Sequence, residues 1–145
     1  MEEFVLDWEA PIPFKEPTPP RFSGMPGLYA IVFENEIIYI GKAESQGSSA
    51  RARQHDFTAC LKDQGKIWDA SKAIRYFATF SNDQNSARID DAEKLLVFKL
   101  PTTICNQILW RKYKGVIPFK VISQGSRPPG LPEVIQYPYL ILKIG

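Results

Sequence analysis

The sequence predicts an α+β protein in which a small antiparallel sheet of about three strands is flanked by helices, with short extra strands in the C-terminal tail. Runs rich in β-branched and aromatic residues predict the strands, and segments with apolar residues at helical spacing predict the helices. In chain order these are strands 27–33 and 36–41, helix 48–65, strand 72–80 and helix 85–100. Two such helices would cover the faces of an antiparallel sheet.

Turn and capping residues mark the ends of these elements. Only Glu34 and Asn35 separate the first two strands, which predicts a tight hairpin, because asparagine tolerates a positive φ. The first helix begins with serines and stops at Gly65, and the second ends just before Pro101.

The distribution of proline divides the chain. Residues 10–26 hold six of the twelve prolines, and proline removes backbone donors, so residues 1–26 are expected to form a proline-rich extended arm. Residues 27–107 are predicted to be the compact domain, and 108–145 a basic extension packed on it. In that extension the proline-interrupted runs 116–122 and 134–144 are expected to be edge strands.

The bulk composition is that of a soluble globular protein, with 44% hydrophobic and 23% charged residues in 145. Cys60 and Cys105 have no CxxC spacing and apolar neighbours, which favours two buried thiols over a zinc site or a disulfide. The acidic N-terminus does not resemble a signal peptide, and no run approaches the ~18 apolar residues of a membrane span. We therefore expect a cytoplasmic protein without a membrane partner.

The net charge of +2 conceals an uneven distribution. Residues 1–36 carry seven acidic and two basic residues, whereas 106–145 carry six basic residues and one acidic residue. A basic body suits an anionic partner, since lysine and arginine contacts to phosphate provide most non-specific affinity for nucleic acid. Many solvated surfaces are equally uneven, so this observation alone does not identify the partner.

One carboxylate falls on the apolar side of the second predicted helix. At 100° per residue, Glu93 lies within the arc formed by Ile89, Leu96 and Leu100, while Asp90 points elsewhere. Burying a carboxylate costs several kcal/mol unless a cation compensates it. Two interpretations stay open at this point: a functional acid, or an acid at the stripe edge that pairs with a lysine or reaches water.

Other candidates lie on the first helix and on the hairpin. Arg51 and His55 are four residues apart and share a helix face, whereas Arg53 points away, toward solvent or a phosphate backbone. Tyr29 and Tyr39 lie on adjacent paired strands. Separately, His55 is equally explained as a surface residue, and the tyrosines as sheet residues with buried rings and hydrated hydroxyls.

Taken in order, these residues resemble the signature of the GIY-YIG nuclease superfamily. The resemblance spans about 27–107, and its second half is a full YIG, while Leu28 replaces the usual isoleucine. The serine- and glycine-containing stretch 44–50 is similar to an insertion in restriction-type members. The resemblance does not distinguish a restriction-type member from a phage-type or defence-type member. The matching positions are Gly27-Leu28-Tyr29, Tyr39-Ile40-Gly41, Lys42-Ala43, Arg51 with His55, Glu93, and Asn106.

The resemblance implies an endonuclease that hydrolyses phosphodiester bonds in DNA with one metal ion. Glu93 would hold Mg²⁺ or Mn²⁺, and Arg51 would neutralise charge on the phosphate. Tyr29 would be the general base, with His55 relaying its proton or orienting it, and Tyr39 would bind the attacking water or the phosphate.

Supporting roles follow from the same resemblance. Lys42 or the metal would supply the positive charge that lowers the pKa of Tyr29. Gly41 is architectural, and Asn106 is expected to brace the site or contact substrate. Candidate nucleic-acid contacts are Lys42, Arg53, Trp110, Arg111, Lys112 and Lys114. Aromatic residues among cations, as in 110–114, suit stacking on bases, although a basic surface segment with core aromatics explains them equally well. DNA is favoured over RNA, with a monomer or homodimer. The alternative is a catalytically inactive, nuclease-like module that binds nucleic acid.

Overall fold

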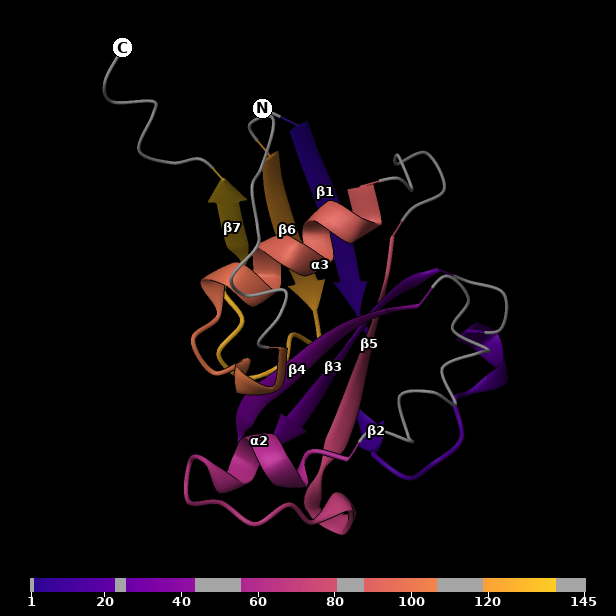
Figure 1. Ribbon diagram of the computed structural model, residues 1–145. Helices are drawn as coiled ribbons and strands as arrows, with labels where there is room; N and C mark the ends of the chain where they lie inside the picture. The colour runs from indigo at the N-terminus through magenta and orange to yellow at the C-terminus, as the bar shows by residue number, and fades with distance from the viewer. Residues whose placement is uncertain (1, 23–25, 44–55, 81–87, 107–118, 138–145) are drawn as a thin grey trace, which may run out of the picture.

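The computed structural model describes residues 2–22, 26–43, 56–80, 88–106 and 119–137. Within these ranges the strands form one mixed sheet in the order β4-β3-β5-β1-β6-β7, with β2 also paired to β5 (Figure 1). The strands are β1 Glu2–Trp8, β2 Ile12–Pro13, β3 Gly27–Phe33, β4 Glu36–Ala43, β5 Ile74–Thr79, β6 Phe119–Gly125 and β7 Val134–Tyr137. The helices are α2 Thr58–Lys62 and α3 Arg88–Lys99, with 3-10 turns η1 Pro20–Phe22, η3 Ala70–Lys72 and η4 Ile104–Asn106.

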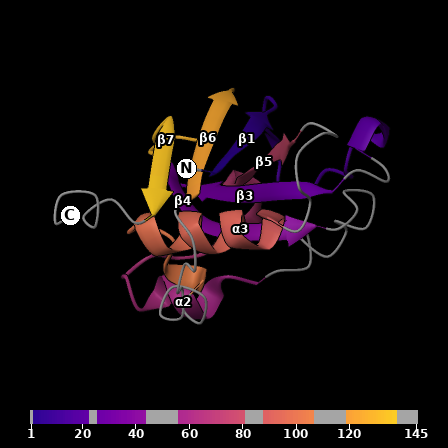
Figure 2. The ribbon, with the colours of Figure 1, turned by 90° about the horizontal axis from the view of Figure 1, so that it is seen from above.

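The predicted fold class is therefore wrong. Instead of about three strands flanked by helices, the described residues form a seven-stranded mixed sheet curled into a half-barrel, with α2 and α3 as their only α-helices. Figure 2 shows β3 running at a steep angle to β6 and β7, with α3 alongside. Local patterns predict strands, but which strands pair depends on contacts between distant segments.

The segment expected to be an arm contributes an interior strand. Strand β1 pairs in parallel with β6 along its length and antiparallel with β5 at Asp7 and Trp8. Its alternate residues Phe4, Leu6 and Trp8 are buried. Residues 1–26 thus differ from the expected arm because a strand with one apolar face is stabilised by packing that face in the core.

The C-terminal strands also differ from the expectation of two edges. Strand β7 is at the edge, but β6 lies between β1 and β7 and pairs with both. The described strand begins at Phe119, after the proline in the run 116–122, so proline does not interrupt its ladder.

The predicted hairpin is confirmed. Strands β3 and β4 pair antiparallel up to Phe33 and Glu36, and the two residues between them, Glu34 and Asn35, have φ values of 51° and 65°. Both central residues of a type I′ turn take the left-handed conformation, and the twist of that turn matches the twist of the paired strands.

Two apolar clusters pack on the two faces of this hairpin. One contains Leu28 and Ile40 with the buried face of α3, and the other contains Ile31 and Phe57 with α2. The second predicted helix, 85–100, agrees with α3. Of the first, 48–65, the structure describes residues 56–65, and within these the α-helix α2 covers Thr58–Lys62 alone, with Gly65 beyond its end at φ 70°. Within the described ranges no helix has the length and apolar character required to cross a membrane.

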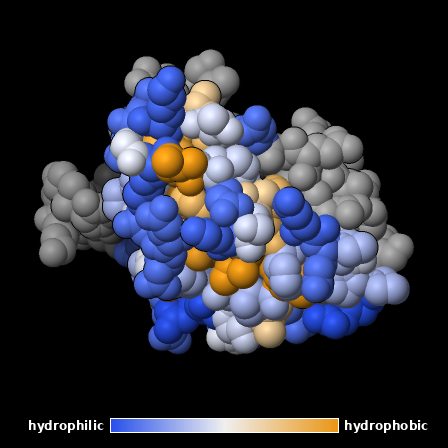
Figure 3. Space-filling model, turned by 90° about the horizontal axis from the view of Figure 1, so that it is seen from below, coloured by the Kyte–Doolittle hydropathy of each residue, from blue (hydrophilic) through white to orange (hydrophobic). Residues whose placement is uncertain are grey.

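The surface seen from the α2 end is largely hydrophilic, broken by small apolar areas (Figure 3). Among the described residues the exposed large hydrophobic side chains are Ile67, Phe98 and Val134. Scattered apolar residues of this kind are ordinary on soluble proteins.

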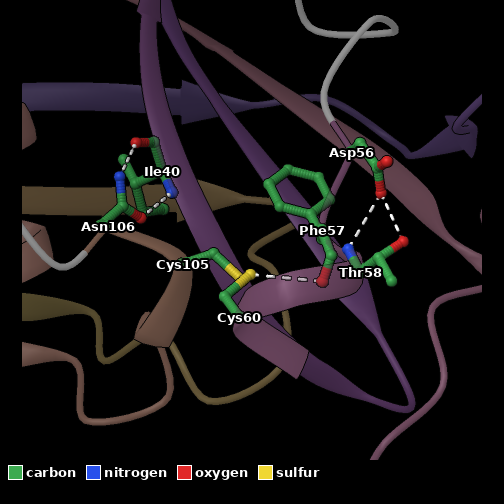
Figure 4. Close-up of a disulfide and its surroundings, with 7 residues drawn as sticks. All are labelled: Ile40, Asp56, Phe57, Thr58, Cys60, Cys105 and Asn106. Carbon is green, nitrogen blue, oxygen red and sulfur yellow. Dashed lines mark hydrogen bonds between the residues drawn. A yellow bond between two sulfur atoms is a disulfide. The ribbon is translucent and has the colours of Figure 1, made fainter. Parts of the chain in front are cut away.

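The expectation of two separate buried thiols is wrong. Cys60 of α2 and Cys105 of η4 form a disulfide, with Cα atoms 5.4 Å apart (Figure 4). Forty-five positions separate them in sequence, but η4 returns to the side of the sheet that α2 covers. Because disulfides persist mainly in oxidising compartments, this bond removes one of the arguments for a cytoplasmic location.

Loss of this disulfide should lower stability. We expect Cys60→Ser to reduce the free energy of unfolding by about 2–4 kcal/mol, because the cross-link restricts the unfolded chain. Urea unfolding with and without reductant measures the effect, and Cys105→Ser is the matched variant. If wild type and both variants unfold alike without reductant, the two thiols are not joined.

Candidate active site

Tyr29 lies across Gly41 at the centre of the hairpin. The two residues are partners in the β3–β4 register. A Cβ atom added to Gly41 would overlap Cζ and Oη of Tyr29. The glycine is therefore required by the position of the phenol ring, in agreement with its expected architectural role. The ring of Tyr29 consequently extends over the edge strand β4.

The second tyrosine stands beside the first. Tyr39 pairs with Ile31 on the same sheet face, and its ring stacks with that of Tyr29 at a centroid distance of 6.1 Å and an interplanar angle of 29°. The ring of Phe57 also contacts that of Tyr39, at a centroid distance of 5.4 Å. Tyr29 is buried, whereas Tyr39 is partly exposed. The structure thus brings the two predicted phenols together.

Glu93 reaches the same strand from α3. Its side chain is buried, as the helical pattern predicted, and the backbone N–H of Lys42 donates to its carboxylate. Lys42 directly follows Gly41, and consecutive strand residues face opposite sides of a sheet, so Glu93 approaches β4 from the α3 side and Tyr29 from the α2 side. The acid is not directed toward bulk water, and it lies at the edge strand that the phenol ring crosses.

Burial controls the ionisation of Glu93. Desolvation raises its pKa from 4.5 to about 7, although the positive charge of Lys42 acts in the opposite direction. Asp90 raises this pKa further, and Lys94 lowers it. A buried carboxylate that is costly to ionise gains stability from a cation bound beside it, which is a common property of functional sites.

Lys42 and Lys94 share one carboxylate on α3. Lys42 Nζ lies 3.3 Å from Oδ1 of Asp90, and Lys94 Nζ lies 2.8 Å from Oδ2. The hydrogen bond from Lys94 is the largest influence holding the pKa of Asp90 below its usual value, and Lys42 adds to it. Asp90 and Lys94 were not among the predicted site residues, although their i,i+4 spacing indicates an ion pair on one helix face.

Asn106 braces strand β4 from outside the sheet. Its Oδ1 accepts from the backbone N–H of Ile40 at 2.7 Å, and its Nδ2 donates to the Ile40 carbonyl at 2.8 Å (Figure 4). Asn106 is buried, and the β4 backbone engages both ends of its amide. This geometry agrees with the expected bracing role rather than with substrate contact.

Several predicted site residues lie outside the described residues. They are Arg51, Arg53, His55, Trp110, Arg111, Lys112 and Lys114. The phosphate-neutralising and proton-relaying groups expected of the site therefore stay predictions.

Among the described residues, Glu93 offers one buried carboxylate to a divalent ion at this position. Within the described ranges no three His, Cys, Asp or Glu side chains gather in a group that could hold a metal. Mg²⁺ often keeps several waters and takes one or two carboxylates from the protein. The buried carboxylate of Glu93 fits such an ion, because binding would compensate the cost of its burial.

Comparisons with known proteins do not identify a family for this chain. Neither a family model nor a curated protein matches the sequence. The resemblance to GIY-YIG nucleases consequently depends on the motif residues of the sequence.

A methyl group at Gly41 should displace the phenol ring. We expect Gly41→Ala to cost about 1–3 kcal/mol, because the added Cβ overlaps Tyr29. In a Tyr29→Ala background the same substitution should cost much less, and thermal unfolding of the four proteins measures this coupling. Equal costs in both backgrounds would show that Tyr29 does not occupy this position.

Ionisation of Glu93 should lower stability as pH rises. Its pKa is 4.5 ordinarily and about 7 in the fold, so the folded state binds more protons between these values. The free energy of unfolding should therefore fall by about 3 kcal/mol from pH 4.5 to 8. Urea unfolding across this range should show a smaller fall in Glu93→Gln, and Mg²⁺ should stabilise only wild type at pH 8. If the stability of wild type and of Glu93→Gln depends on pH in the same way, and Mg²⁺ stabilises neither protein, both expectations are wrong.

Proposed function

We propose that this protein is a metal-dependent endonuclease that hydrolyses phosphodiester bonds in DNA, with a catalytic centre of the GIY-YIG type. One observation carries the proposal. The buried carboxylate of Glu93 and the phenol of Tyr29 meet consecutive residues of β4, beside the cation of Lys42. The proposal requires that the phenol from the α2 side of β4 and the acid and cation from its α3 side meet at the edge of this strand.

Each candidate site residue that the structure describes has a proposed role in this reaction. Tyr29, in its phenolate form, would accept a proton from the attacking water, whose oxygen forms a bond to phosphorus while the bond to the 3′ oxygen breaks. The departing 3′ oxygen would take a proton from solvent. Tyr39, stacked on Tyr29, would hydrogen-bond the water or a phosphate oxygen. Lys42 would supply positive charge to the phosphate.

Glu93 would hold Mg²⁺ or Mn²⁺ through its carboxylate. When bound, such an ion polarises the phosphate and stabilises the negative charge that develops on it. In this proposal Arg51 would contact the phosphate, and His55 would relay the proton. Asn106 would act through the backbone of Ile40, which it holds in place next to Gly41.

Nucleic acid is the proposed partner because of the charge distribution. Sixteen of the eighteen lysine and arginine residues follow position 36, against nine acidic residues. Cations supply sequence-independent affinity for phosphates, and the aromatic residues of the segment 110–114 suit stacking on bases. A nuclease-like module without turnover would share this binding but not the cleavage.

Cleavage should require both the metal and Glu93. We expect wild type to cut a plasmid and labelled DNA duplexes in Mg²⁺ but not in EDTA, and Glu93→Gln to reduce the rate about 100-fold or more. Asp91→Asn, which alters the same helix outside this centre, is the control and should cut normally.

Matched single-stranded DNA and RNA in the same assay define the substrate. Binding of DNA without cleavage by wild type would favour the inactive binding module. If wild type neither binds nor cleaves DNA, both the nuclease and the inactive binding module are ruled out.

A further inference from the structure

A shared carboxylate lies between the two lysines beside Glu93. Asp90 receives Lys42 on Oδ1 and Lys94 on Oδ2. Lys94 is the closer partner, at 2.8 Å against 3.3 Å, and lies one helical turn away on the same helix. Asp90 therefore keeps a neutralising partner on its own helix when Lys42 leaves it.

Lys42 is placed to exchange one anion for another. Its backbone is fixed in β4 and donates to Glu93, so only the side chain needs to move. The side chains of Lys42 and Asp90 are 31% and 42% exposed, which leaves this ion pair open to a ligand. Exposed ion pairs contribute up to about 1 kcal/mol, so a phosphate could displace the aspartate at small cost.

We propose that Asp90 is a positioning residue that holds Lys42 in the free protein and releases it to a phosphate of the bound nucleic acid. This inference rests on the proposed function, since it concerns the phosphate-binding cation of the same site. Asp90 competes with the substrate for Lys42, so it weakens binding while keeping the lysine oriented along α3. Lys94 neutralises the carboxylate after the exchange.

The adjacent aspartate offers a matched control. Asp91 pairs with Arg88 at 2.7 Å and is 38% exposed, close to the exposure of Asp90. Asp91→Asn changes the net charge by the same amount as Asp90→Asn, but it leaves Lys42 paired. A difference between the two variants therefore reports the competition for Lys42 rather than total charge.

Affinity for DNA in EDTA tests this proposal without requiring cleavage. Fluorescence anisotropy with a labelled duplex should show about threefold tighter binding for Asp90→Asn than for Asp91→Asn at low salt. The difference should shrink at higher ionic strength, because the competing pair is exposed. In a Lys42→Gln background the advantage of Asp90→Asn should disappear. A purely structural role for Asp90 would not produce a gain in affinity.

The possible outcomes separate this inference from the proposed function. If Asp90→Asn binds no more tightly than Asp91→Asn, or keeps its advantage without Lys42, the competition is overturned, while Mg²⁺-dependent cleavage by wild type leaves the nuclease proposal standing. If wild type binds no DNA, the proposed function and this inference fall together. Tighter binding by Asp90→Asn that depends on Lys42 supports the exchange even where wild type fails to cleave.

Discussion

The edge of strand β4 that pairs with no other described strand is the constraint on which the candidate site depends. β4 is the outermost strand of the sheet next to β3, and an edge strand leaves backbone donors and acceptors without a neighbouring strand. Two side chains form hydrogen bonds with backbone groups at this edge. Asn106 binds both backbone groups of Ile40, and Glu93 accepts from the N–H of Lys42. Because these contacts are two residues apart, they also fix the segment over which Tyr29 lies.

This arrangement couples stability to the chemistry we propose. Glu93 satisfies the backbone of Lys42 only by entering a buried position, where its ionised form is costly. The nearby lysine offsets part of that cost. A bound divalent cation would offset more, so the same burial that destabilises the free site would favour metal binding.

The two faces of the hairpin meet at this edge. Tyr29, Tyr39 and Phe57 pack on the α2 side, while Lys42 and Glu93 belong to the α3 side. Element η4 connects these regions, since Cys105 is bonded to Cys60 of α2 and the next residue, Asn106, holds β4. The disulfide therefore anchors the element that positions the strand, which two separate thiols would not do.

Much of the local structure was predictable, because it follows from short-range preferences. Two strands separated by Glu34 and Asn35 can close only through a tight turn, and an acid within an apolar helical arc had to become buried or find a partner. The alternation of Phe4, Leu6 and Trp8 is a strand signal, but the interpretation of residues 1–26 as an arm rests on their proline content. The sequence by itself therefore determined the hairpin, the third strand, the buried face of α3 and the candidate residues.

Only the tertiary structure decided the parallel pairing of β1 with β6, the joining of Cys60 to Cys105 and the sharing of Asp90 by two lysines. Except for Asp90 with Lys94, these contacts join segments far apart in the chain, and their energies depend on the whole packed sheet rather than on any local pattern.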